Sequence, residues 1–179
     1  MAPIKIILRK LENIDIASFL FVSDKSNYLS LRALAYCLSV FGNGYFYIFA
    51  LPFIICWMSP VKGVSIFVVC VVSVFFEKML YMMLKRGFKR ARPPVRLESV
   101  TEIVRPPDEF SFPSGHSSTA FCLAVVLSHY FHQMRVEFFT IAGLIAVSRV
   151  VLRAHFPLDV IVGSLLGSSV ACIVLTFLS

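Results

Sequence analysis

A histidine, an aspartate and an arginine near the C-terminus have a spacing that suits phosphoryl chemistry. Arg149 is followed after five residues by His155, and Asp159 comes four residues after His155. If a helix begins near Pro157, a residue type favoured in a first helical turn, His155 and Asp159 can approach each other. A carboxylate hydrogen-bonded to one imidazole nitrogen fixes the tautomer and raises the basicity of the other. The spacing therefore predicts a nucleophilic histidine, and the alternative is a plain salt bridge between Arg149 and Asp159.

A second cluster, Pro-Ser-Gly-His at 113–116, stands where a long apolar run begins. The start of a helix presents unpaired backbone N–H groups and the positive end of the helix dipole, so it can bind an anion. Ser114 would either cap the helix or donate to a phosphate oxygen, and Gly115 would let the backbone approach the ligand. His116 would serve as a proton donor near neutral pH. An ordinary serine cap beside an interfacial histidine is the simpler interpretation.

A third cluster consists of Lys85 and, after six further residues, Arg92-Pro93. Arginine offers a bidentate fork to phosphate and lysine a point charge, so this pair can clamp an anion. Cations at the end of a membrane helix also have a plain explanation, because they reach for the interface or follow the positive-inside bias. Arg153, near the first cluster, is predicted to be an interfacial or loop cation.

The clusters are separated by stretches that are apolar enough to cross a membrane. Hydrophobic residues make up 58% of the 179-residue chain and charged residues 15%, a balance unusual for a soluble domain. A spanning helix needs roughly 20 mostly apolar residues. Five stretches meet this need: 36–57, 61–84, 117–131, 138–152 and 158–178. The first has a kink or helix start at 42–44, and the third is extended by 113–116. The chain is therefore predicted to be one domain, 1–179, forming an all-α polytopic membrane helix bundle of five to six transmembrane helices.

The order of these stretches places the three clusters on one face of the membrane. With five spans, the polar segment 85–113 and the turn 153–157 emerge on the same side, so 85–113 is predicted to be an active-site loop. Residues 1–14, the start of a predicted N-terminal segment 1–35, carry apolar positions near helical spacing with basic residues between them. That pattern predicts an amphipathic N-terminal segment lying at the interface, and a frayed terminus is the alternative.

The charge of the chain favours an anionic lipid over nucleic acid. Lys and Arg number 17 against 10 Asp and Glu, and much of the excess lies in one segment between apolar runs. The acidic residues of that segment are predicted to offset its positive charge, unless one of them helps to select substrate: Glu98, Glu102, Asp108 and Glu109. The five cysteines show no metal-ligand spacing and suit small apolar positions. His129 and His132 are predicted to be interfacial, because a metal site needs more ligands.

Taken in this order, the clusters resemble the signature of the type-2 phosphatidic acid phosphatase superfamily. Lys85-x6-Arg92-Pro93 is similar to its first motif, the segment 113–116 to its second, and Ser148-Arg149-x5-His155-x3-Asp159 to its third. The same signature occurs in vanadium-dependent haloperoxidases, which are soluble, and the long apolar runs argue against that branch.

The resemblance implies a reaction scheme without metal or other cofactor. In a member of this family, His155 would attack phosphorus and form a phosphohistidine, and Asp159 would orient and activate it. His116 would protonate the leaving oxygen and later activate water. A cradle of donors would hold the phosphoryl oxygens: Lys85, Arg92, Ser114, the Gly115 N–H and Arg149.

The sequence thus predicts an integral membrane enzyme that removes phosphate from a lipid phosphomonoester or pyrophosphate. Undecaprenyl pyrophosphate is the first choice, followed by phosphatidic acid, phosphatidylglycerol phosphate and lipid A phosphate. The alternative is a non-catalytic lipid-binding or transport protein, which the intact His155, Asp159 and His116 disfavour. The expected partners are the lipid substrate and the bilayer, with no nucleic acid. The resemblance indicates a bacterial inner membrane protein with its site facing the periplasm, although the basic loop favours the cytoplasm.

Overall fold

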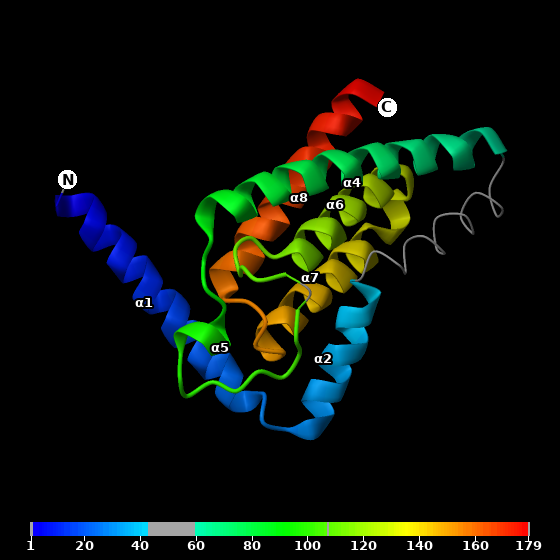
Figure 1. Cartoon of the computed structure of the whole chain (residues 1–179). Coiled ribbons are helices and arrows are strands. Elements are labelled where there is room, and N and C mark those ends of the chain that lie inside the picture. The colour runs from blue at the N-terminus through cyan, green and yellow to red at the C-terminus, as the bar shows by residue number, and fades with distance from the viewer. Residues whose placement is uncertain (1, 43–59, 107, 179) are drawn as a thin grey trace.

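Every regular element in the described part of the chain is a helix. The computed structural model describes residues 2–42, 60–106 and 108–178. Its elements are α1 Ala2–Lys25, α2 Leu29–Phe41, α4 Pro60–Phe88, α5 Pro93–Arg96, α6 Gly115–Tyr130, the 3₁₀ turn η1 His132–Met134, α7 Arg135–Val151 and α8 Pro157–Leu178 (Figure 1). The predicted all-α class is confirmed for these residues.

Two stretches of the described residues are long and apolar enough to cross a membrane. They are Val61–Arg96, which contains α4, and Pro157–Leu178, which is α8. Helices α6 and α7 have 16 and 17 residues, which at roughly 1.5 Å per residue is less than the roughly 30 Å hydrocarbon core of a bilayer. Most of the predicted span 36–57 lies outside the described residues, and α2 ends at Phe41 with Gly42 as its cap. The number of spans stays a prediction.

The centre of the bundle is formed where α4, α6 and α8 meet. Its buried side chains form one apolar cluster: Ile66, Val69, Cys70, Cys122, Leu123, Val126, Val170, Ala171, Val174 and Leu175. Helices α6 and α8 approach each other closely at Gly163 and Gly167. A methyl group on Gly163 would lie 2.5 Å from the carbonyl oxygen of Ser114, and one on Gly167 would overlap the carbonyl oxygen of Ser118. Glycine at these positions lets the two backbones touch.

The N-terminal segment forms two helices that cover one end of the bundle (Figure 1). Phe19 of α1 is fully buried in a cluster with Val150, Phe156 and Val160. Ala35 of α2 is buried against the end of α7. The predicted N-terminal helix is therefore present, and the frayed-terminus alternative is wrong. Asp15 and Phe19 of α1 are buried, whereas Ile14 and Phe21 are exposed, and the interfacial location of the helix stays a prediction.

The predicted loop 85–113 begins too early. Helix α4 continues to Phe88, so Lys85 lies in its last turn. Basic residues at a helix C-terminus interact favourably with the helix dipole, so Lys85 and Arg86 extend the helix. Lys89 follows with a φ of 46°, in the left-handed region where helices commonly end. Lys85 is consequently held on a rigid helix rather than in a loop.

Candidate active site

Residues from all three motifs line one small cavity, called here the motif pocket. The pocket has a volume of about 160 Å³ and is lined by Gly42, Lys78, Tyr81, Arg92, Pro106, Asp108, Gly115, His116, Thr119, Arg149 and His155. The ends of α4 and α7 therefore meet the starts of α6 and α8, as the predicted topology requires. His116 and His155 share this pocket, so one phosphate group can contact both.

His155 occupies the turn between α7 and α8 and is 2% exposed. Its Nε2 lies 3.5 Å from a guanidinium nitrogen of Arg92. Burial, followed by the positive charges of Arg92 and Arg149, lowers the pKa of His155 well below its usual value. The imidazole is consequently neutral at pH 7 and has a lone pair for nucleophilic attack.

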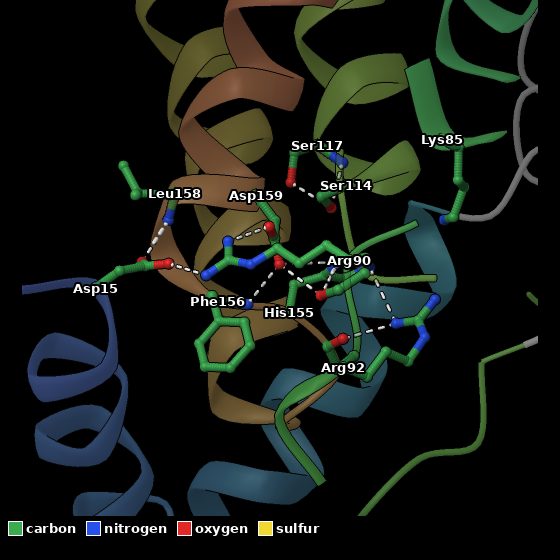
Figure 2. A network of polar contacts seen from close by, with 12 residues as sticks. Asp15, Lys85, Arg90, Arg92, Ser114, Ser117, His155, Phe156, Leu158 and Asp159 are labelled. Atoms are coloured by element: carbon green, nitrogen blue, oxygen red, sulfur yellow. Dashed lines mark hydrogen bonds and ion pairs between the residues drawn. The ribbon is translucent and has the colours of Figure 1, made fainter. Parts of the chain in front are cut away.

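Asp159 lies in the first turn of α8, fully buried, and contacts His155 indirectly (Figure 2). Its Oδ2 is 3.9 Å from His155 Nδ1, too far for a hydrogen bond. Ser111 Oγ donates to the same Oδ2 at 2.5 Å and lies 3.5 Å from His155 Nδ1. The predicted direct hydrogen bond is thus not formed in the free protein, and Ser111 lies between the two residues. The salt-bridge partner of Asp159 is Arg90 at 2.6 Å, so the predicted alternative pairing with Arg149 is wrong.

Arg149 is a buried cation with an unused donor. It lies in the last turn of α7, is 2% exposed and donates from Nη1 to Ser39 Oγ. Its Nε has no hydrogen-bond partner among the described residues. A buried charge with an unpaired donor is costly, and an anion in the motif pocket would supply the missing acceptor.

Lys85 and Arg92 both bind the carboxylate of Asp108. Lys85 Nζ pairs with one oxygen and Arg92 Nη2 with the other, and Tyr81 donates to the same group at 2.5 Å. Burial acts to raise the pKa of Asp108, but the hydrogen bonds from Lys85 and Tyr81 and the nearby positive charges outweigh it, so the pKa lies below its usual value. An ionised carboxylate thus lies between the two cations predicted to hold phosphate. Asp108 therefore pairs with two particular residues, whereas the sequence predicted only that it offsets the charge of the segment.

Replacing Asp108 with asparagine is expected to tighten the binding of inorganic phosphate by about tenfold. The charged form competes with phosphate for Lys85 and Arg92, and removing a competing state raises the apparent affinity by the inverse of the fraction of protein that was free to bind, here about one tenth. Inhibition of turnover by phosphate measures the effect. Glu109→Gln makes the same charge change one residue along, at an exposed position, and should leave inhibition unchanged. Weaker inhibition in Asp108→Asn would instead mean that Asp108 positions the two cations for phosphate.

Ser114 caps α6 rather than facing the motif pocket. Its hydroxyl accepts from the Ser117 amide at 3.5 Å and from Ser117 Oγ at 2.9 Å, and its own amide donates to the Asp159 carbonyl at 2.9 Å. It is fully buried and is not among the described residues that line the pocket. The structure therefore favours the capping interpretation for Ser114, while Gly115 and His116 do reach the pocket.

Arg153 lies in the turn between α7 and α8 and does not line the motif pocket, as expected of a loop cation, but its side chain is buried. It is 8% exposed and donates to Thr101 Oγ1 at 3.0 Å, Asn27 Oδ1 at 3.0 Å and the Ser23 carbonyl at 3.2 Å. These bonds tie the segment after α5 to the N-terminal helices. The long side chain thus joins three parts of the chain behind the site.

Sequence reasoning missed several residues that complete the site. Tyr81 lies one turn before Lys85 on α4, a spacing at which helical side chains meet, and this signal was available. Lys78 lines the motif pocket and donates to Thr119 Oγ1 at 2.8 Å. No local pattern in the sequence marks three further residues, because each contacts a residue distant in sequence: Ser111, Arg90 and Asp15.

An all-helical fold with two histidines and several cations around one pocket is the arrangement expected of a membrane phosphatase. The chain belongs to the PAP2 superfamily, whose model matches residues 63–179. The predicted family resemblance is therefore confirmed.

Relatives of this chain include curated proteins and a solved structure. The chain is 35% identical over 99 residues to the lipid A 1-phosphatase of Rhizobium etli, covering 53% of this chain and 43% of that protein. It is 36% identical over 107 residues to phosphatidylglycerophosphatase B of Bacillus subtilis, covering 51% and 47%. The crystal structure of LpxE from Aquifex aeolicus matches with a TM-score of 0.77 and 30% identity, over 90% of this chain and 94% of that one. The chain thus spans less than half the length of these two curated relatives and nearly all of the solved structure.

Proposed function

We propose that this protein is a lipid phosphate phosphatase that works through a phosphohistidine. The observation that carries the proposal is the motif pocket itself: a neutral, buried His155 and a second histidine, His116, lie around one cavity with Arg92 and Arg149. Transfer of a phosphoryl group depends chiefly on positioning and on stabilising negative charge. This arrangement supports that chemistry better than a passive lipid-binding site, which needs no nucleophile.

The proposed reaction begins with attack of His155 Nε2 on phosphorus. Nδ1 is on the side of Ser111 and Asp159, whereas Nε2 lies beside Arg92, a proposed phosphate-binding residue, so Nε2 is the proposed nucleophile. As the N–P bond forms, the P–O bond to the lipid breaks and His116 gives its proton to the leaving oxygen. Water then attacks the phosphohistidine, His116 takes a proton from that water, and inorganic phosphate is released. The N–P bond breaks in this second step, so His155 acts as nucleophile and then leaving group, while His116 acts as acid and then as base.

Arg92, Arg149 and Lys85 are proposed to hold the phosphoryl oxygens. Arg149 contributes the Nε that lacks a partner among the described residues. Lys85 and Arg92 would exchange the carboxylate of Asp108 for the phosphate. At about 160 Å³ the pocket suits a phosphate group and adjoining atoms, so the rest of the lipid would remain in the bilayer.

The substrate is proposed to be a lipid phosphomonoester or pyrophosphate. The sequence favours undecaprenyl pyrophosphate, while the relatives, a lipid A 1-phosphatase and a phosphatidylglycerophosphatase, favour lipid A 1-phosphate and phosphatidylglycerol phosphate. The proposed location is a bacterial inner membrane with the motif pocket facing the periplasm. A compartment-sensitive reporter fused after α8 tests this orientation, because it should report the cytoplasm if five helices span the membrane.

A phosphate-release assay over purified lipids tests the function. The full chain in detergent, with EDTA present, is expected to release phosphate from at least one of four lipids: undecaprenyl pyrophosphate, phosphatidic acid, phosphatidylglycerol phosphate and lipid A. Release that stops when EDTA is added would refute the metal-free scheme. Binding of these lipids without any release, in protein that remains folded, would support the non-catalytic alternative.

A further inference from the structure

The carboxylate of Asp159 is held by donors that are not among the defining residues of the three motifs (Figure 2). Its Oδ1 accepts from Arg90 Nη1 at 2.6 Å, and its Oδ2 accepts from Ser111 Oγ at 2.5 Å and from the Phe156 amide at 2.9 Å. Asp159 is fully buried. A buried carboxylate is costly unless it is paired and hydrogen-bonded, so these donors fix both its charge and its orientation.

Arg90 connects Asp159 to a second buried carboxylate. Its Nη2 donates to Asp15 Oδ2 at 2.6 Å, while its Nη1 donates to Asp159 Oδ1. The guanidinium lies 4.4 Å from the centre of the Phe156 ring, which is itself packed edge-on against Phe19 at 5.2 Å. Two carboxylates and an aromatic face therefore fix the plane of the guanidinium, a geometry that the point charge of a lysine cannot reproduce.

Asp15 also fixes the start of the helix that carries Asp159. Its side chain is fully buried in α1, and its Oδ1 accepts from the Leu158 amide at 2.8 Å. That amide lies in the first turn of α8, where backbone N–H groups lack helical partners and a negative charge is favourable. One residue further along the chain is Asp159. Asp15 thus contacts both the cation beside Asp159 and the backbone next to it.

We propose that Asp15 and Arg90 are positioning residues for Asp159, so that α1 is a working part of the active site. This inference rests on the proposed function. Asp159 and His155 Nδ1 are 3.9 Å apart with Ser111 between them, so a small rotation of the carboxylate changes how the imidazole is held. Asp15 lies outside residues 63–179, which means that the family motifs alone do not reveal this role.

Asp15→Asn and Arg90→Gln test the proposal: the first keeps the shape of the side chain and removes its charge, and the second replaces the guanidinium with a shorter, neutral amide. Each is expected to lower kcat about tenfold, since small misplacements of catalytic groups cost up to about 100-fold. KM should stay within about twofold, because neither residue lines the motif pocket. The double variant should lose no more than the worse single variant, because residues acting as one unit are not additive.

Glu12→Gln is the matched control. Glu12 lies about one turn before Asp15 on the same helix and pairs with Arg96, both residues being more than a third exposed. The substitution makes the same charge change without touching Arg90 or α8. It should keep wild-type kcat, and melting temperatures in detergent should identify any variant that has lost its fold.

Binding of orthovanadate gives a readout that needs no lipid substrate. Vanadate adopts the five-coordinate geometry of the transition state with an imidazole nitrogen, and analogues of this kind depend on the aligned catalytic group. Calorimetry should show about tenfold weaker vanadate binding in Asp15→Asn, with phosphate binding unchanged. If Asp15→Asn does not fold, Arg90→Lys is compared in the same way, with an intermediate loss expected.

The outcomes separate the two proposals. Wild-type protein that releases no phosphate from any lipid contradicts the proposed function, while the vanadate comparison still reports on Asp15 and Arg90. Folded Asp15→Asn and Arg90→Gln proteins that match Glu12→Gln in kcat and in vanadate affinity would overturn the positioning role, whatever the substrate proves to be.

Discussion

His155→Ala is expected to abolish phosphate release, with a loss of at least about 1,000-fold in kcat. The substitution removes the atom proposed to bond phosphorus, and the other described residues of the motif pocket offer no equivalent neutral imidazole on the side of Ser111 and Asp159. Binding of phosphate should survive, since Lys85, Arg92 and Arg149 remain. A radiolabelled lipid phosphate should label the wild-type protein in an acid-labile form and leave His155→Ala unlabelled.

His129→Ala is the control for this experiment. It removes the same side chain from an exposed position near the end of α6, at the opposite end of that helix from His116. Its turnover should equal that of the wild type. Turnover retained by folded His155→Ala would reject His155 as the nucleophile. His116, which also lines the motif pocket, would then be tested in that role.

The motif residues could be predicted from the sequence because each motif is local. His155, Asp159 and Pro157 lie within five positions, so the start of α8 and the approach of the two side chains follow from helix geometry. The alternation of apolar runs and polar segments then placed the clusters at one end of the bundle. Most of the helices were also predictable, since α4, α6, α7 and α8 coincide with four of the apolar stretches.

Contacts between distant segments could not be predicted in this way. Asp15 and Arg90 are 75 residues apart, and neither position differs in type from its charged neighbours. Asp108 was one of four acidic residues in the polar segment, and only the fold selects it for Lys85 and Arg92. A hydrogen bond between His155 and Asp159 was predicted from their spacing, but Ser111 comes between them because its own segment crosses the start of α8.

The close contact of α6 and α8 had a sequence signal that was not used. Gly163 and Gly167 are four residues apart, the Gly-x-x-x-Gly spacing at which membrane helices pack with their backbones in contact. This contact sets the distance between Ser114, which caps α6, and Asp159, whose carbonyl accepts from the Ser114 amide at 2.9 Å. The geometry of the second and third motifs thus depends on Gly163 and Gly167, which have no side chain to hold the two helices apart.

Gly167→Ala is accordingly expected to destabilise the protein more than alanine at a glycine that has open space around it. The new methyl would overlap the Ser118 carbonyl oxygen and lie 3.0 Å from the Cys122 amide nitrogen. Both are backbone atoms, which cannot move aside as a flexible side chain can, so the helices must separate. Overpacking of this kind costs about 1–3 kcal/mol, and the melting temperature in detergent should fall by about 5 °C or more.

Gly143→Ala in α7 makes the same change where the new methyl meets no atom within 4 Å. Alanine is the better helix former by roughly 0.5–1 kcal/mol, so the control should melt at or slightly above the wild-type temperature. Because separating α6 from α8 also moves the Ser114 cap relative to Asp159, Gly167→Ala should lose activity at temperatures where it is still folded. Equal melting temperatures for the two variants would show that α6 and α8 are less tightly packed than this contact implies. That result would also contradict the dependence of the site on the packing of these helices.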